Sequence, residues 1–234
     1  MGIVKILVKS RLKQTPIYPL LNRLRLRAET KRRAEADSAV IAEWEHCGRL
    51  VPPPDALKQR TVRQYGERFS LKSFVETGTF LGDMVDAVRG GFKTIYSIEL
   101  DSALFEKAKT RFSTNKNIAL FRGDSGDLLP QILRDLREPS LFWLDAHYSC
   151  GFTARGDLDT PILAELASIL QHDIPGHVIL VDDARCFNGE HDYPTIERLR
   201  EFVLGRRPEL AMKVEDDIIR IHPFITQGYW GPAA

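Results

Sequence analysis

Residues 74–82, FVETGTFLG, place the strongest constraint on what this chain can fold into. The stretch opens with apolar residues typical of the end of a buried strand, and Glu76 follows at the strand's carboxyl end. Gly78 and Gly82 then bracket a turn that leads into a helix beginning near Asp83. At the edge of an open α/β sheet, this order brings a backbone close to a small ligand. The stretch therefore predicts a nucleotide-like ligand at this strand end.

The composition is that of a globular chain that can bury a full core, with 43% hydrophobic and 28% charged residues among 234. No apolar run approaches the roughly 18 residues that a membrane-spanning helix needs. The amino-terminal stretch has no long apolar centre, so a secretory signal is not expected. The cysteines Cys47, Cys150 and Cys186 are scattered and fit neither a disulfide framework nor a CxxC metal site. These features favour a cytoplasmic protein.

Charge is distributed unevenly along the chain. Residues 1–33 hold ten basic side chains and one acidic side chain, Glu29. Subtracting these from the 33 basic and 32 acidic residues of the whole chain leaves 23 basic and 31 acidic residues. Such a basic arm favours an anionic membrane surface or another acidic partner, or it packs as a solvated helical face. Aromatic residues do not alternate with the basic ones, so no nucleic-acid partner is expected.

The first part of the chain is expected to be mostly helical. Prolines divide it into a short piece and a longer helix over about residues 20–47. Gly48 and the proline run at 52–54 end this region. We therefore expect a basic helical extension at 1–54 and a second domain at 55–234.

The second domain alternates short strands with helices, which predicts a doubly wound, mostly parallel α/β sheet. Its last two strands, AMKVE and IIRIHP, are joined only by Asp216 and Asp217, so they are expected to form an antiparallel hairpin. With five parallel strands before the hairpin, the sheet is expected to have seven strands. The five parallel strands are predicted at 73–78, 94–100, 118–123, 140–145 and 177–182. The helices are predicted at 55–65, 83–89, 102–113, 126–137, 160–172 and about 194–205.

This order, with the acidic-x-Gly-x-x-x-Gly loop of residues 76–82, resembles the class I S-adenosylmethionine (SAM)-dependent methyltransferases over about residues 60–225. A dinucleotide-binding loop needs G-x-G-x-x-G, but counting from Gly78 the next two glycine positions hold Phe80 and Asp83. The resemblance implies a Rossmann-like fold, SAM as cofactor and methyltransferase activity.

The resemblance also implies cofactor contacts at the ends of the first three strands. Glu76 would take the ammonium of the methionine moiety, Glu99 the ribose hydroxyls, and Asp124 with Ser125 the adenine amino group. An acid at a strand end also serves as a helix cap, and this alternative stays open for each of them. The full predicted cofactor set is Glu76, Thr77, Gly78, Thr79, Gly82, Glu99, Asp124, Ser125 and Asp145.

Residues for the chemistry are expected at the ends of the fourth and fifth strands. The fourth strand ends in Asp145-Ala146-His147, and the fifth in Asp182-Asp183. Because neighbouring strands lie about 4.8 Å apart, these carboxylates should face one another near the transferred methyl. His147 is the predicted general base, with Asp145 as its catalytic neighbour, because imidazole titrates close to working pH. In the alternative, the histidine is hydrogen-bonded to its own loop.

A divalent cation is a further expectation at the same place. Asp145, Asp182 and Asp183 offer carboxylate oxygens, which Mg²⁺ and Ca²⁺ prefer. A metal there would lower the pKa of an acceptor hydroxyl. The cluster resembles that of the macrocin-type sugar O-methyltransferases. In the alternative, Asp183 caps the next helix or pairs with Arg185, and no metal binds.

The stretch 144–166, LDAHYSCGFTARGDLDTPILAEL, resembles a group of bacterial methyltransferases found with surface-glycan biosynthesis. That group has two glycines after the serine, where this chain has Cys150 and Gly151. Arg155 is expected to pair with an anionic acceptor or with Asp157. The resemblance implies O-methylation of a hydroxyl on a sugar, a glycan or another small acceptor.

Two other functions stay open. One is N-methylation of a small amine, although the Asn-Pro-Pro-Tyr type motif of amino-directed enzymes is replaced here by Asp145-Ala146-His147-Tyr148. The other is a non-catalytic interaction module with this fold, against which the intact glycine loop argues. The expected partner is a small-molecule or glycan acceptor, and a homo-oligomer stays open.

Overall fold

The structure is a computed structural model that describes residues 18–146 and 160–224. The predicted base His147 lies outside the described residues, and so do Cys150 and Arg155.

The chain divides into two compact units, Met1–Leu50 and Val51–Ala234. In the first unit, the helix predicted over residues 20–47 is present as α2 (Tyr18–His46), which is 29 residues long. Within the part of the chain that the structure describes, no helix is long and apolar enough to cross a membrane.

The second unit contains a seven-stranded sheet in the order β3-β2-β1-β4-β5-β7-β6. The first five strands are parallel to one another, and β7 is antiparallel to both β5 and β6. The predicted doubly wound, mostly parallel sheet with an antiparallel hairpin is thus confirmed. The strands are β1 (Ser73–Thr77), β2 (Thr94–Glu99), β3 (Ile118–Arg122), β4 (Ser140–Leu144), β5 (Val178–Val181), β6 (Leu210–Glu215) and β7 (Ile218–Pro223).

The terminal hairpin forms at the predicted link. Glu215 pairs with Ile218, and Asp216 and Asp217 between them both have positive φ angles, of 55° and 60°. Two-residue hairpin turns of this twist require positive φ at both positions, and aspartate tolerates that conformation better than most residues.

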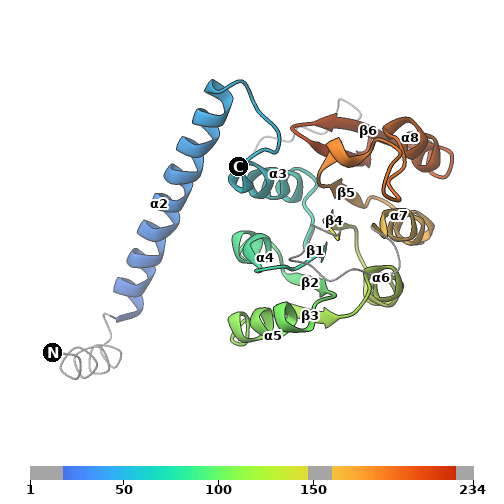
Figure 1. Ribbon diagram of the computed structural model, residues 1–234. Coiled ribbons are helices and arrows are strands. Elements are labelled where there is room, and N and C mark those ends of the chain that lie inside the picture. Colours follow the sequence, from blue (N-terminus) through green and yellow to red (C-terminus); the bar gives the residue numbers. More distant parts are fainter. Residues whose placement is uncertain (1–17, 147–159, 225–234) are drawn as a thin grey trace. The chain divides into compact units, whose positions relative to one another are not determined.

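Helices cover both faces of the sheet (Figure 1). On β1, Phe74 packs with the cluster that includes residues of α3, α4 and α5, while the next residue, Val75, packs with residues of α6, α7 and α8. This alternation follows from the two-residue period of a strand. The helices are α3 (Asp55–Arg68), α4 (Asp83–Val88), α5 (Ser102–Arg111), α6 (Ser125–Asp135), α7 (Ile162–Gln171) and α8 (Ile196–Leu204), with the 3₁₀ helix η1 (Ala184–Cys186) after β5.

The direction of winding reverses at β1, which lies between β2 and β4. The helix that follows β1 is α4 on one face, and the helix that follows β4 is α7 on the other. In open α/β sheets, ligands bind in the crevice outside the carboxyl ends of the strands at such a reversal. The predicted ligand loop, at the end of β1, lies at this point.

Gly78 allows the ends of β1 and β4 to lie close together. Its φ is +88°, and a Cβ at this position would lie 2.5 Å from the backbone oxygen of Asp145. Its N–H donates to the backbone oxygen of Ile98 on β2, at 3.0 Å. The sequence predicted that glycine here allows a ligand to approach. The structure adds a second requirement, because the backbone after β4 already occupies the space that a side chain would need.

We expect Gly78→Ala to destabilise the protein by about 2 to 4 kcal/mol, since it combines a left-handed backbone with a clash against backbone atoms that cannot rotate away. Urea unfolding measures the loss. Gly90→Ala is the matched control, because nothing lies within 4 Å of a Cβ there, and its midpoint should stay near that of the wild type. Equal midpoints for Gly78→Ala and the wild type would show that the two strand ends can separate at no cost.

Candidate functional site

Several carboxyl groups lie at the carboxyl ends of the parallel strands, where a ligand is expected to bind. Glu76 ends near the tip of β1 and Glu99 ends β2, while Asp145 follows β4 and Asp182 follows β5. Among these, Glu76, Glu99 and Asp182 are buried, and Asp145 is partly exposed. Buried carboxyls without full pairing are uncommon and mark functional sites more often than chance.

Glu76 lies beneath the glycine turn and is 1% exposed. It accepts a hydrogen bond from Ser97 Oγ at 2.5 Å, and Ser97 Oγ is in turn 2.6 Å from Thr79 Oγ1. Burial raises the pKa of Glu76 to about 8, the Ser97 hydrogen bond opposes this, and the nearby charges of Asp145 and Glu99 add to it. In the ligand-free protein, Glu76 therefore holds a proton at neutral pH, and a cation placed beside it would favour the charged form. The predicted ammonium contact stays a prediction.

Glu99 ties the glycine turn to the end of β2. One carboxylate oxygen accepts from the backbone N–H of Phe80 at 2.7 Å, and the other from the N–H of Asp101 at 2.8 Å. Burial raises the pKa of Glu99, although these two backbone hydrogen bonds oppose the rise. An ionised carboxylate offers about four acceptor positions, so the predicted contact with ribose hydroxyls is chemically open.

Asp124 is the cap of α6, accepting from the N–H of Gly126 at 2.7 Å. The helix-cap alternative therefore applies to Asp124, whereas Glu76 and Glu99 cap no helix. Ser125, the first residue of α6, is buried. The adenine contact predicted for this pair remains a prediction.

Gly82, at the other end of the loop, caps α4 with a φ of +80°. A Cβ there would lie 2.7 Å from the ring of Phe112 at the end of α5. The glycine lets the first turn of α4 pack against this ring, which keeps the loop closed over the strand end.

Glu165, on α7, is a buried acid that was not predicted from the sequence. It is 1% exposed, and within the described residues its Oε1 and the neighbouring Thr77 Oγ1 have no hydrogen-bond partner. Burial raises the pKa of Glu165 to about 7. The hydroxyls of Ser125 and Thr77 face the carboxyl and favour its charged form, although neither reaches Oε1 in hydrogen-bond geometry. The available signal was an acid within the apolar run ILAELASIL, on the face that a helix of this kind buries.

The expected cluster of aspartates is present. Carboxylate oxygens of Asp145, Asp182 and Asp183 lie within 4.8 Å of one another. Asp183 has a φ of +54°, which turns the chain directly after β5, and its N–H donates to Asp182 Oδ1 at 2.9 Å. Burial and the charge of Asp145 raise the pKa of Asp182 to about 7.

Within the described residues, Lys58 and Arg185 are cations that contact this cluster. Lys58, from α3, places Nζ 2.6 Å from Asp182 Oδ2 and 3.7 Å from Asp183 Oδ1. Arg185 Nη1 lies 2.7 Å from Asp183 Oδ1 and also pairs with Asp217. The Asp183–Arg185 pair is the alternative that the sequence left open. Lys58 was missed, because a single lysine in a mixed polar helix gives no signal of its distant partner.

The pKa values of Lys58 and Asp182 are both raised. Burial lowers the pKa of Lys58, but the charges of Asp182, Asp183 and Asp145 outweigh it and raise the pKa overall. The pKa of Asp182 is also raised, because burial and the negative charge of Asp145 outweigh the attraction of Asp182 to Lys58. Burial and the surrounding carboxylates therefore set both pKa values.

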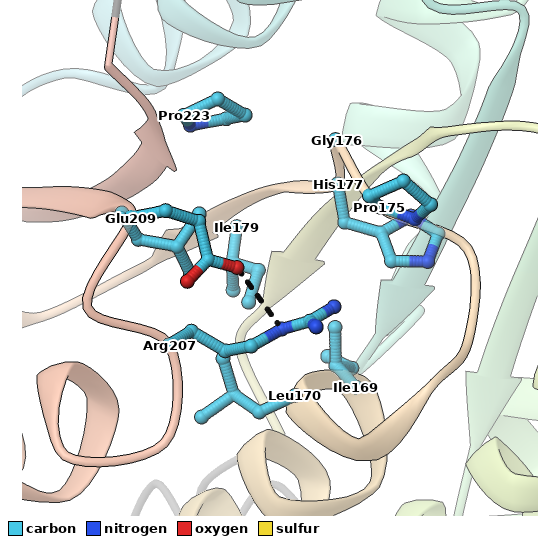
Figure 2. A pocket seen from close by; sticks show the side chains of 10 residues that line it. Ile169, Leu170, Pro175, Gly176, His177, Ile179, Arg207, Glu209 and Pro223 are labelled. Atoms are coloured by element: carbon cyan, nitrogen blue, oxygen red, sulfur yellow. Dashed lines mark ion pairs between the residues drawn. The ribbon is translucent and has the colours of Figure 1, made fainter.

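A cavity of about 310 Å³ lies at the opposite edge of the sheet (Figure 2). It is lined by residues at the start of β5 and the end of β7, including His177 and Pro223, and by the ion pair of Arg207 with Glu209 at 3.6 Å. Burial lowers the pKa of His177 to about 4, so this histidine is neutral. None of the predicted site residues that the structure describes lines this cavity.

The fold is found in solved methyltransferase structures. TomG, an O-methyltransferase from Streptomyces achromogenes in complex with SAM, is 18% identical, with a TM-score of 0.55 over 81% of this chain and 89% of TomG. An O-methyltransferase from Bacillus cereus in complex with SAH is 15% identical, with a TM-score of 0.56 over 81% of this chain and 91% of the other. PaMTH1, an SAH-bound methyltransferase from Podospora anserina, is 17% identical, with a TM-score of 0.51 over 86% and 96%.

No protein-family model matches the sequence, and no curated protein does either. At these identities, the structural likeness establishes the fold. This chain therefore has the class I SAM-dependent methyltransferase fold.

Glu76→Gln is expected to flatten the pH dependence of stability in the ligand-free protein. Folding raises the pKa of Glu76 from 4.5 to about 8, so its contribution to stability is full below pH 4.5 and is lost as the pH rises to about 8. The unfolding free energy of the variant minus that of the wild type should rise by about 3 kcal/mol between pH 5 and pH 8, measured by urea unfolding.

Glu106→Gln is the control, because this side chain is exposed on α5, and its profile should follow the wild type. Parallel pH profiles for the wild type and Glu76→Gln would contradict a buried, protonated carboxyl under the glycine turn.

Proposed function

We propose that this protein transfers a methyl group from SAM to a hydroxyl oxygen of a sugar, glycan or other small acceptor. The observation that carries the proposal is the buried carboxyl network beneath the glycine turn at the point where the sheet reverses: Glu76 with Ser97 and Thr79, and Glu99 on Phe80. Three solved methyltransferases share the fold, and TomG, which is described in complex with SAM, is an O-methyltransferase. The proposal therefore combines a ligand site with a fold that is used for this reaction.

SAM carries positive charge on its ammonium and its sulfonium, and the site is rich in carboxyls. Burial disfavours the charged form of Glu76, and the ammonium of SAM beside it would stabilise that form. Glu76 would then release its proton as the ligand binds. Glu99 would accept from the ribose hydroxyls with its remaining lone pairs, and Asp124 and Ser125 would lie at the adenine end.

Methyl transfer is a single displacement. The acceptor oxygen attacks the methyl carbon, the carbon–sulfur bond breaks, the electron pair goes to sulfur to give SAH, and the acceptor hydroxyl loses its proton. The protein's contribution is alignment of the three atoms and a place for that proton. We assign the proton to His147, which follows Asp145 by two residues in the chain. Asp145 would orient this base or stabilise its charged form.

The cluster of Asp145, Asp182 and Asp183 fits a divalent cation such as Mg²⁺. Its donors are carboxylate oxygens gathered within 4.8 Å, and hard cations such as Mg²⁺ prefer oxygen ligands of this kind. A bound metal would supply Lewis acidity that lowers the pKa of the acceptor hydroxyl.

The sugar or glycan acceptor is proposed from the sequence of the stretch 144–166. An amine acceptor is the second candidate, and a screen of SAM consumption over sugar, phenol and small-amine acceptors separates the two. Consumption with amines alone would move the assignment from oxygen to nitrogen.

We expect the wild type and His147→Ala to bind SAM with similar affinity in calorimetric titration, and we expect the variant to lose about 10²- to 10⁴-fold in turnover. The reason is that a general base acts on the acceptor's proton and not on the cofactor. Turnover is measured with the acceptor that the consumption screen identifies.

Two results would contradict this scheme. A wild type that binds no SAM at millimolar ligand removes methyl transfer as the function and leaves the interaction module. Full activity of His147→Ala removes this residue as the base but keeps the proposed reaction.

The basic arm, residues 1–33, is proposed to hold the protein at an anionic membrane surface, because ten of its side chains are basic. Removal of this arm should weaken sedimentation with vesicles containing anionic lipid, with neutral vesicles as the control. Unchanged sedimentation after truncation would assign the arm to packing instead.

A further inference from the structure

Lys58 brings a cation into the aspartate cluster from another part of the fold. It lies on α3, before the first strand, and its side chain is only 14% exposed. Its Nζ donates to Asp182 Oδ2 at 2.6 Å and lies 3.7 Å from Asp183 Oδ1. The charge of Asp145 also acts on it. A single ammonium thus faces the three carboxylates that would hold a metal.

Among the residues that the structure describes, carboxylates outnumber cations around the cluster. Four carboxylates meet here, those of Asp145, Asp182, Asp183 and Asp217, against the two cations Lys58 and Arg185. Arg185 pairs with Asp183 and Asp217, whereas Lys58 donates to Asp182. Among these six described groups, negative charges exceed positive ones by two when all four carboxylates are ionised.

We propose that Lys58 is a tethered cation that competes with a divalent metal for this cluster and thereby sets the metal affinity of the site. The inference rests on the metal role assigned under the proposed function. In the absence of metal, Lys58 holds Asp182 and Asp183 together against their mutual repulsion. When a metal binds, it needs the same oxygens.

The geometry makes the two cations compete. Mg²⁺ and Ca²⁺ lie about 2.0 to 2.6 Å from carboxylate oxygens. Lys58 Nζ lies 2.6 Å from Asp182 Oδ2, so a metal on this oxygen would be no more than about 5 Å from the ammonium. At that distance, in a partly buried site, two cations repel each other substantially. Lys58 must then withdraw, or the metal binds more weakly than the donor set alone would allow.

The test measures metal binding directly, with Mn²⁺ followed by the electron paramagnetic resonance signal of the free ion, on the full chain. We expect Lys58→Met to bind Mn²⁺ at least about tenfold more tightly than the wild type, because one competing charge is gone. Lys58→Arg keeps the charge and should bind like the wild type. Lys107→Met removes a charge from the exposed face of α5 and is the matched control, with unchanged affinity.

Loss of Lys58 leaves Asp182 without its partner, so Lys58→Met is also expected to melt at a lower temperature in chelator and to recover with Mn²⁺. Lys58→Gln is the second variant, since it can still donate to Asp182 without carrying charge, and it should show the same gain in affinity.

Each pattern of binding decides the inference. Binding by Lys58→Gln or Lys58→Met that is tighter than in the wild type, or present only in those variants, supports competition. Equal or weaker binding in both variants overturns it while leaving the metal site in place. No Mn²⁺ binding in any variant overturns both the competition and the metal role, and SAM titration still judges methyl transfer separately.

Discussion

The contact between Gly78 and the backbone oxygen of Asp145 is the constraint on which the site depends. The N–H of Asp145 donates to the backbone oxygen of Thr77 where the sheet reverses its winding, and only a residue without a Cβ at position 78 allows that close approach. The acids that end these strands and their neighbours then lie at one edge. Cofactor and acceptor groups can meet there because the two strand ends touch.

Burial of carboxyls at this edge gives the site its chemical character. Glu76, Glu165 and Asp182 all have pKa values raised to between about 7 and 8, mainly by loss of solvent. Such groups favour the binding of a cation, because a nearby positive charge offsets the desolvation cost of the ionised carboxylate. A ligand with an ammonium and a sulfonium, and a divalent cation beside it, both meet this requirement. Lys58 and Arg185 supply part of this positive charge, through their ion pairs with Asp182 and Asp183.

Much of the fold could be predicted because its signals are local. Each parallel strand is a short apolar run, and each observed parallel strand lies within its predicted range. The hairpin followed from the two aspartates between its strands, which tolerate the positive φ that the turn needs. The predicted cofactor and metal residues follow from the same logic, since acids after parallel strands must share one edge. Lys58 and Glu165 were missed because their partners lie far away in the chain.

The sequence by itself determined the elements, their alternation, the glycine turn and the acids that follow the strands, since these depend on neighbouring residues and on the periods of strand and helix. Only the tertiary structure decided that Asp124 caps a helix, that Glu76 is buried against Ser97, and that Lys58 reaches Asp182 from α3. The physical reason is that burial and charge pairing are properties of the packed chain. The ionisation of a carboxyl depends on how much solvent it loses and on which charges surround it in space.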